Sequence, residues 1–380
     1  MLPPIQFQLL ITILRIGPPQ VNKFPLQLQN DDVYTACASV ILDLVKEAMQ
    51  YERLQGSDVR CHLCAHNCLI HNGQRGICAV RENRDGTLYS LVYGKVVSVN
   101  IDPIEKKPLF HFLPGSTSLS IATVGCNFRC KHCQNYEISQ FPRERKFPIP
   151  GRDMQPEDIV SAAADNRCAS VSYTYTEPTI FFEFAHDCAR IASEKGIKNV
   201  FVSNGYTGAE ATRVIAPYLS ANNIDLKGSD KFYREICGAR LEPVKNTIRL
   251  MKELGVWVEV TTLIIPDLND SEKDLTGIAE FICSVDSSIP WHVSQFYPTY
   301  KLLDKPRTPV EKLRHARDIG YKSGLKYVYE GNVPGAGGED TSCPGCKEIV
   351  IKRFGYRIIE NRLRNGKCPK CGGTIEGVWV

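Results

Sequence analysis

The sequence predicts an α/β fold in which parallel strands are covered by helices and flanked by two cysteine-rich segments. Between Ser118 and about Tyr297, short β-rich runs alternate with longer amphipathic stretches, which is the pattern of strand–helix units. Gly196 and Gly255 end two of these stretches, where helix C-termini usually lie. Clustered Cys-x2-Cys pairs before and after this region indicate metal-binding modules.

The expected elements follow one another in a regular order. We expect strands at residues 118–125, 169–178, 198–205, 222–228, 256–266 and 292–298. We expect helices at residues 156–166, 179–196, 209–220, 244–255 and 272–285. In parallel sheets of this kind, chemistry gathers at the carboxyl ends of the strands, so polar residues there are the first candidates for a site.

Length and composition favour an intracellular enzyme with appended modules. The chain has 380 residues, of which 43% are hydrophobic, enough to bury a large core. Its net charge of +4 neither favours nor excludes a nucleic-acid partner. The apolar N-terminal run is short, contains Arg15 and ends in prolines, so we expect an extension rather than a membrane span or a signal peptide. Clustered thiols indicate a reducing compartment and predict a cytoplasmic location.

Sixteen cysteines fall into three groups with ligand-like spacing and five single residues. The groups are Cys61, Cys64, Cys68 and Cys78; Cys126, Cys130 and Cys133; and Cys343, Cys346, Cys368 and Cys371. The single residues are Cys37, Cys168, Cys188, Cys237 and Cys283. We expect these five to be small, buried core residues, and Cys188 falls on an apolar stripe within residues 181–192.

The most informative segment is GCNFRCKHCQN, residues 125–135, which directly follows an expected strand. Its Cys-x3-Cys-x2-Cys spacing can provide three thiolates to a cubane iron–sulfur cluster. Because the loop has no fourth cysteine, one iron keeps an open position at which a substrate can bind and react. A structural zinc knuckle is the alternative. His132 lies between two ligands, so we expect it to face solvent or an electron donor rather than iron.

The two flanking groups have four thiols each. Spacing leaves the first, residues 61–78, open between a second iron–sulfur cluster and a tetrahedral zinc. Four ligands would close either site, which favours electron transfer or structure over substrate chemistry. The last group, CPGC and CPKC separated by 21 residues, is the strongest zinc signal in the chain, and residues 349–363 between the pairs can form a hairpin. The tail from residue 343 carries eight Lys or Arg against three acids, which suits RNA, an acidic partner or simple solvation.

Together these motifs resemble one enzyme family. The spacing in residues 125–135 is similar to the signature of the radical S-adenosylmethionine (SAM) superfamily. The segments CHLCAHNCLIHNGQRGICAVREN, DPIEKKPLFHFLPGS, GCNFRCKHCQN, DLKG and GNVPGAGGEDTSCPGC resemble the radical SAM enzymes of the AmmeMemoRadiSam system, relatives of pyruvate formate-lyase activating enzyme. The resemblance covers roughly residues 60–380. It implies a partial (β/α)6 barrel, a [4Fe–4S] cluster and SAM, but no particular substrate.

The expected domain organisation has five parts. They are an extension at residues 1–60, a cysteine-rich N-terminal module at 61–115, a radical SAM barrel at 116–330, a Gly-rich linker at 331–342 and a zinc-ribbon-like tail at 343–380. In this arrangement the three-cysteine loop belongs to the barrel, and each four-cysteine group belongs to a separate module.

The resemblance also assigns polar residues at the strand ends to SAM. Glu177 in YTYTEPT stands where the family's GGEP-type segment has a glutamate for the SAM amine, although Tyr-Thr replaces Gly-Gly here. The remaining candidates match three further elements of the family and are Ser203, Asn204, Asp225, Lys227 and His292. The alternatives are a glutamate that caps a helix, an internal ion pair and a buried polar histidine.

Two classes of function follow from these observations. The resemblance implies an enzyme that reductively cleaves SAM to methionine and a 5′-deoxyadenosyl radical. The radical would abstract hydrogen from a protein or nucleic-acid substrate, in a glycyl-radical-type activation or a modification reaction, with electrons from a low-potential donor such as ferredoxin or flavodoxin. The second class is a metal-dependent nucleic-acid or protein binding module without radical chemistry. The complete three-cysteine loop together with Glu177 favours the enzyme.

Overall fold

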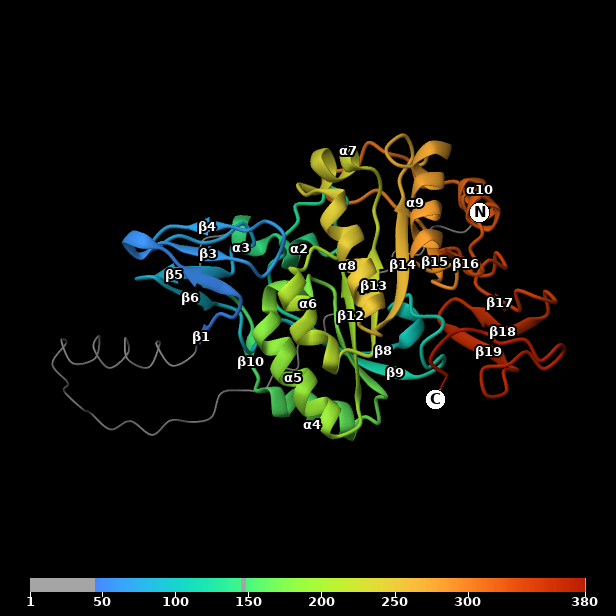
Figure 1. Cartoon of the computed structure of the whole chain (residues 1–380), viewed down its shortest axis with the longest axis horizontal. Helices are drawn as coiled ribbons and strands as arrows, with labels where there is room; N and C mark the ends of the chain where they lie inside the picture. Colours follow the sequence, from blue (N-terminus) through green and yellow to red (C-terminus); the bar gives the residue numbers. More distant parts are fainter. Residues whose placement is uncertain (1–44, 145–147, 380) are drawn as a thin grey trace, which may run out of the picture. The chain divides into compact units, whose positions relative to one another are not determined.

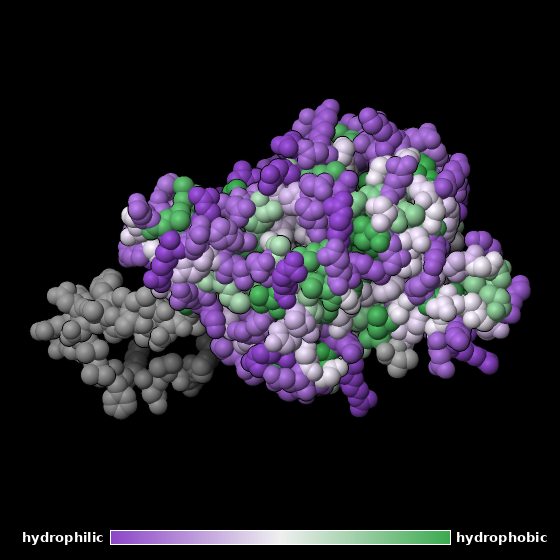
Figure 2. Space-filling model, viewed as in Figure 1, coloured by the Kyte–Doolittle hydropathy of each residue, from purple (hydrophilic) through white to green (hydrophobic). Residues whose placement is uncertain are grey.

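The computed structural model describes residues 45–144 and 148–379 (Figure 1). The apolar N-terminal run and Cys37 lie outside the described residues, so the expectations for them remain predictions. On the face seen in Figure 2, hydrophilic residues predominate and hydrophobic ones are scattered between them. No helix in the described part of the chain is long and apolar enough to cross a membrane.

A central eight-stranded sheet organises the chain, with the strand order β16-β15-β14-β13-β12-β11-β9-β8. Its strands are β8 (Ser98–Pro103), β9 (Thr117–Ala122), β11 (Ser170–Tyr173), β12 (Lys198–Ser203), β13 (Ala221–Asp225), β14 (Trp257–Ile264), β15 (Trp291–Gln295) and β16 (Val328–Gly331). Neighbours from β9 to β16 pair in parallel, and β8 pairs antiparallel with β9. All six expected strands are present, and β8 and β16 extend the sheet on its two edges.

Helices connect the parallel strands and pack against the sheet (Figure 1). They are α4 (Pro156–Asp165), α5 (Phe182–Glu194), α6 (Ala209–Ile215), α8 (Leu241–Glu253), α9 (Glu272–Val285) and α10 (Val310–Lys322). Cys188 is fully buried on α5, as its place in the apolar stripe predicts. The predicted α/β class and partial barrel are confirmed. The elements α10 and β16 have no counterpart among the expected ones, because α10 buries only a thin stripe of its mostly polar sequence.

Shorter elements complete the barrel. They are β7 (Lys95–Val96), η3 (Ile104–Lys106), α2 (Tyr136–Ser139), α3 (Phe141–Glu144), β10 (Arg152–Asp153), η4 (Pro178–Phe181), η5 (Ala216–Tyr218), α7 (Asp230–Phe232) and η6 (Tyr233–Cys237). The last of these is a single π-helical turn. Such turns are rare and are frequent at functional sites.

The N-terminal module consists of two small antiparallel sheets. One contains β2 (Tyr51–Arg53), β3 (Val59–Cys61) and β4 (Leu69–Ile70), and the other contains β1 (Lys46–Glu47), β6 (Thr87–Ser90) and β5 (Arg81–Arg84). The short helix η2 (Gln55–Ser57) joins β2 to β3. Asp85 and Gly86 both have positive φ and form the two-residue turn between β5 and β6. This hairpin sets the position of Arg81 behind the first cysteine group.

The C-terminal tail forms a three-stranded antiparallel sheet of β17 (Thr341–Ser342), β18 (Ile349–Phe354) and β19 (Arg357–Asn361). The hairpin expected between the two Cys-x2-Cys pairs is therefore confirmed. The tail shares a hydrophobic cluster with Phe110 and Tyr329 of the barrel. Arg353 is buried and donates to the carbonyl oxygen of Phe110 at 2.8 Å, so the tail is packed onto the barrel.

Candidate active site

The three-cysteine loop begins just after β9 and packs against the N-terminal module. Gly125 has a φ of 103°, and a Cβ at this position would lie 2.7 Å from Val80 Cγ1 and 3.4 Å from the carbonyl oxygen of Cys78. Both the backbone conformation and the close approach therefore require glycine. The start of the loop is thus fixed beside the first four-cysteine group.

Backbone hydrogen bonds hold the middle of the loop against the π-helical turn η6. The N–H groups of Arg129 and Lys131 donate to the carbonyl oxygens of Cys237 and Ile236, at 2.8 and 3.0 Å. Between them and Cys126, Phe128 is buried and makes edge contacts with aromatic rings on both sides. The loop is therefore anchored through its main chain, which leaves its thiol groups available as ligands.

Arg143 holds the same loop from the other side through hydrogen bonds. Its guanidinium donates to the carbonyl oxygens of Cys126 and Phe128, and also to that of Ile77 in the N-terminal module at 2.9 Å. One partly buried cation thus ties the loop to the residue that precedes Cys78. Sequence reasoning missed this residue, because the carbonyls that it joins are far apart in the chain.

The donor set of the loop fits a [4Fe–4S] cluster. Burial raises the pKa of the Cys126 and Cys133 thiols, so a positively charged metal group must displace their protons to bind. Beside the thiols, Asn127 Nδ2 and His132 Nδ1 are buried and have no hydrogen-bond partner among the described residues. Buried N–H groups in this state fit a group that can accept hydrogen bonds from them, as the sulfides of a cluster do.

His132 and Cys237 behave differently from what the sequence predicts. The expectation that His132 faces solvent is wrong, because its side chain is buried beside Phe232 and burial lowers its pKa to about 3. Cys237 is buried as expected, but it is not isolated. The ligand atoms of Cys130, His132 and Cys237 lie within 4.8 Å of one another. A hydrogen bond with Cys237, together with burial, raises the pKa of the Cys130 thiol.

Glu177, Ser203 and Asn204 form one buried polar group at the ends of β11 and β12. The Glu177 carboxylate accepts hydrogen bonds from Ser203 Oγ at 2.8 Å and from the Asn204 N–H at 2.7 Å. It also accepts from the N–H and the hydroxyl of Thr179, at 3.0 and 2.6 Å, as the cap of η4. Burial raises the pKa of Glu177, although these bonds oppose the shift. The capping role named as an alternative is therefore present in the structure.

Asn204 connects this polar group to the cysteine loop. Its side-chain amide lies 3.8 Å from Cys126 Sγ and donates to Asn127 Oδ1 at 2.7 Å. Three of the residues assigned to SAM are therefore brought together at one side of the predicted cluster. Asn127 was not identified as a site residue from the sequence, although its position next to the first cysteine could have indicated it.

Asp225 and Lys227 lie on the other side of the loop, at the end of β13. Lys227 Nζ is 2.6 Å from Asp225 Oδ2, and both side chains are partly buried. Burial alone would lower the pKa of Lys227, but Asp225 and the thiols of Cys130 and Cys237 outweigh it and raise the pKa well above its ordinary value. The ion pair foreseen as an alternative exists, and it faces the loop near Cys130.

His292 belongs to a different polar cluster on β15. Its Nε2 is 2.7 Å from Glu259 Oε2, and its ring packs against Phe110 and Tyr329. The residue is buried, and none of these described partners belongs to the cysteine loop. The structure therefore gives His292 the surroundings of a satisfied polar core residue, and its contact with SAM remains a prediction.

A further buried polar group, which was not identified from the sequence, lies at strand β8 of the central sheet. Lys107 Nζ is 2.6 Å from Asp102 Oδ2, and the Tyr175 hydroxyl donates to the same carboxylate. Burial lowers the pKa of Lys107 to about 8, even though Asp102 opposes the shift. The carbonyl oxygen of Tyr175 accepts a bond from Asn135 at 2.8 Å, which joins this group to the end of the cysteine loop.

The four cysteines of the tail are close enough to share one metal ion. Cys343 Sγ lies 3.6 Å from Cys371 Sγ, Cys346 Sγ lies 3.6 Å from Cys368 Sγ, and all four sulfurs are within 4.8 Å of one another. A tetrahedral zinc with bonds of about 2.3 Å places its sulfurs about 3.8 Å apart. The geometry of the tail therefore suits a single ion.

The comparisons with known proteins agree with this site. A model of the radical SAM superfamily matches residues 120–282, which begin within β9, include the cysteine loop and end within α9. An uncharacterized protein of Methanocaldococcus jannaschii is 49% identical over 335 residues, 87% of this chain and 99% of that protein. The chain belongs to the radical SAM superfamily. A putative glycyl-radical enzyme activating enzyme of the same organism is 28% identical over 223 residues, 57% of this chain and 88% of that protein. The pyruvate formate-lyase-activating enzyme of Clostridium pasteurianum is 22% identical over 168 residues, 42% of this chain and 67% of that protein.

Membership confirms the expected reaction class and its cofactors. This radical SAM enzyme uses a [4Fe–4S] cluster and SAM, and it needs a reductant. When bound, the cluster supplies one electron to SAM, which breaks into methionine and a 5′-deoxyadenosyl radical. The four cysteines of the tail are placed so that they could hold a metal ion.

Proposed function

We propose that the three-cysteine loop binds the [4Fe–4S] cluster and that the polar residues at the strand ends hold SAM. The proposed cluster ligands are Cys126, Cys130 and Cys133, and the proposed SAM contacts are Glu177, Ser203, Asn204, Asp225, Lys227 and His292. The observation that carries the proposal is the contact of 3.8 Å between Asn204 Nδ2 and Cys126 Sγ, because it joins the two sets of residues.

In this proposal the two polar groups have complementary charges. The carboxylate of Glu177 suits the cationic amine of SAM, and the ammonium of Lys227 suits its carboxylate. Glu177 and Asn204 lie near Cys126, whereas Lys227 lies near Cys130, so the amino-acid end of SAM would bridge the open side of the loop. His292 is included because of its sequence motif, although its Nε2 is engaged by Glu259.

We further propose that the substrate is a protein from which the radical abstracts a hydrogen atom, as in glycyl-radical activation. One relative in the comparison is described as a putative glycyl-radical enzyme activating enzyme, which supports this class. A nucleic-acid substrate was suggested by the basic tail. However, Arg353 is buried, and Arg362 and Lys370 both pair with Glu348, so fewer of these charges are free for phosphates than the sequence suggests.

Two further partners belong to the proposal. A zinc ion in the tail is supported by the short distances between its four sulfurs. A low-potential protein such as ferredoxin or flavodoxin is the proposed electron donor. A surface cleft lined by Arg129, Arg143 and Lys301, with few acids, would suit an acidic protein of this kind. The cytoplasmic location remains a prediction.

The proposal is tested by SAM cleavage. Anaerobically reconstituted enzyme should form 5′-deoxyadenosine from SAM and dithionite, and Cys126→Ala should reduce this to background. Cys283→Ala, which changes a cysteine outside the three groups, is the matched control and should keep full activity. Cleavage that persists in Cys126→Ala would contradict the assignment. An inactive wild type with a fully loaded loop would favour the binding module without radical chemistry.

A further inference from the structure

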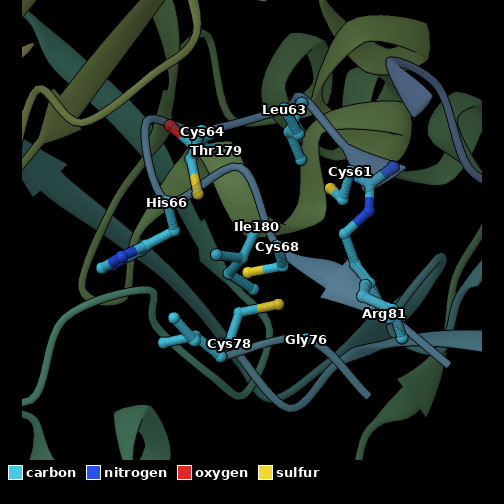
Figure 3. A pocket seen from close by; sticks show the side chains of 12 residues that line it. Cys61, Leu63, Cys64, His66, Cys68, Gly76, Cys78, Arg81, Thr179 and Ile180 are labelled. Atoms are coloured by element: carbon cyan, nitrogen blue, oxygen red, sulfur yellow. The ribbon is translucent and has the colours of Figure 1, made fainter. Parts of the chain in front are cut away.

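The N-terminal four-cysteine group surrounds a small cavity. Cys61, Cys64, Cys68 and Cys78 line it, and in Figure 3 their sulfur atoms face the same space. The remaining lining is mostly apolar, from the side chains of Leu63, Ile70, Ile77 and Ile180. Such surroundings exclude water and bring the four thiols together around a common centre, as a closed metal site requires.

The spacing of these sulfurs differs from that in the tail. In the part of the chain that the structure describes, two sets of candidate ligands lie within 4.8 Å of one another, the tail cysteines and the Cys130–His132–Cys237 set. The four N-terminal thiols do not form such a set. A single zinc needs its sulfurs about 3.8 Å apart. A cubane holds its ligands on four separate irons, so their sulfurs stand farther apart.

A buried arginine at this cavity has two donor atoms without partners among the described residues. Arg81 lines the cavity and is 1% exposed, and its guanidinium lies beside Cys61 in Figure 3. Its Nη2 donates to Met49 O and Glu183 Oε1, at 2.6 and 2.8 Å. Its Nε and Nη1 have no hydrogen-bond partner among the described residues. Two unsatisfied donors beside four thiols fit a group that brings acceptor atoms of its own, as the sulfides of an iron–sulfur cluster do and a single zinc ion does not.

Two short connections link this cavity to the three-cysteine loop. His66, two residues after Cys64, donates from Nε2 to the carbonyl oxygen of Asn127 at 2.9 Å. On the other side, Arg143 donates to the carbonyl oxygens of both Ile77 and Cys126. Ile77 directly precedes Cys78 of the first group, and Cys126 belongs to the three-cysteine loop. The two sites are therefore neighbours, and hydrogen bonds join the segments that carry their cysteines.

We propose that Cys61, Cys64, Cys68 and Cys78 hold a second, closed [4Fe–4S] cluster that delivers electrons to the cluster of the three-cysteine loop. One electron from a low-potential electron-donor protein reduces the second cluster from the 2+ to the 1+ state. The same electron then passes to the first cluster, and the second cluster returns to 2+. The delivery role rests on the proposed function, whereas the presence of the second cluster does not.

Metal analysis of a variant that lacks the first cluster tests the site directly. In the triple variant Cys126→Ala, Cys130→Ala and Cys133→Ala, we expect about four iron and four sulfide per chain and about one zinc. Reduction should give the electron paramagnetic resonance signal of a [4Fe–4S]+ cluster. A folded variant that contains two zinc ions and no iron would overturn the proposal.

Wild-type enzyme provides a second measurement in case the triple variant does not fold. It should contain about eight iron per chain, and about four iron with two zinc would overturn the second cluster. In that case, SAM cleavage by the same preparation would leave the proposed function intact. A wild type with about eight iron that does not cleave SAM would instead contradict the proposed function and keep the second site.

The delivery role has its own test. In Cys61→Ser/Cys64→Ser, dithionite, which is small enough to reach the first cluster, should still support formation of 5′-deoxyadenosine. Photoreduced ferredoxin, which depends on the relay, should support it at least about tenfold less well than in wild type. An equal loss with both reductants would mean that the site is only structural, and no loss with ferredoxin would mean that electrons enter elsewhere. Cys283→Ala again serves as the control.

Discussion

The N-terminal module and the C-terminal tail each present four cysteines, but they place them differently. In the tail, pairs of sulfurs are 3.6 Å apart and all four fit around one ion. In the module, the four thiols surround a cavity, and the buried Arg81 beside it has two donor atoms without described partners. The number of thiols is therefore a poor guide to the metal. The distances between the sulfurs and the polar groups around them are a better guide to which metal is bound.

Removing the tail's ligands should have the largest effect. In Cys343→Ser/Cys346→Ser we expect zinc to be lost and the thermal midpoint to fall by several degrees, because the few buried apolar residues of the tail share one small cluster with Phe110 and Tyr329. Iron content should not change. Inductively coupled plasma spectrometry measures the zinc and iron contents, and thermal melts measure the midpoint. A loss of iron in this variant would contradict the view that the two four-cysteine sites hold different metals.

The contact between tail and barrel should depend on pH through His111. Burial lowers the pKa of His111 to about 4, and its ring nitrogens are 2.6 Å from Glu376 O and 2.5 Å from the Tyr329 hydroxyl. The folded state therefore favours neutral His111. Its contribution is present above about pH 6.5 and is lost as the pH falls toward 4.

We expect the free energy of unfolding of the wild type to decrease by about 2 kcal/mol more than that of His111→Asn between pH 7 and pH 5. Denaturant titrations at the two pH values measure it, and titrating groups that do not interact with His111 cancel in the difference. Equal decreases in the two proteins would show that His111 is not the pH-sensitive element of this contact.

A change at the strand ends should affect SAM and neither four-cysteine site. Glu177→Gln removes the charge opposite the SAM amine, so we expect SAM to bind about tenfold more weakly, which corresponds to about 1.4 kcal/mol. Iron and zinc should remain at wild-type levels. Isothermal titration under anaerobic conditions gives the affinity. Unchanged binding would leave Glu177 as the cap of η4 alone.

Much of this arrangement could be predicted from the sequence, because it depends on local patterns. Alternating strands and helices predict the sheet from β9 to β15, and the Cys-x3-Cys-x2-Cys spacing predicts the loop at its edge. Neither α10 nor β16 was expected from the sequence. Helix α10 has a lower apolar content than α4, α5, α8 and α9, and only four of its thirteen residues are buried.

The rest depended on contacts between distant segments. Spacing cannot show that Arg143 joins Ile77 to Cys126, that His132 is buried, or that Cys237 lies beside Cys130. Nor can it show how far apart four sulfurs lie, which left zinc and a cluster as equal alternatives for the first group. His292 is the opposite case, since its motif suggests SAM whereas its described partners are those of a core residue.

The most direct test is the electron paramagnetic resonance spectrum of the reduced wild-type enzyme before and after addition of SAM. The enzyme should hold one cluster with an open iron, at Cys126, Cys130 and Cys133, and one that is closed by four thiolates. We therefore expect two [4Fe–4S]+ signals, of which SAM shifts one and leaves the other unchanged. A spectrum in which SAM shifts neither signal, or in which a single signal is present, would contradict it.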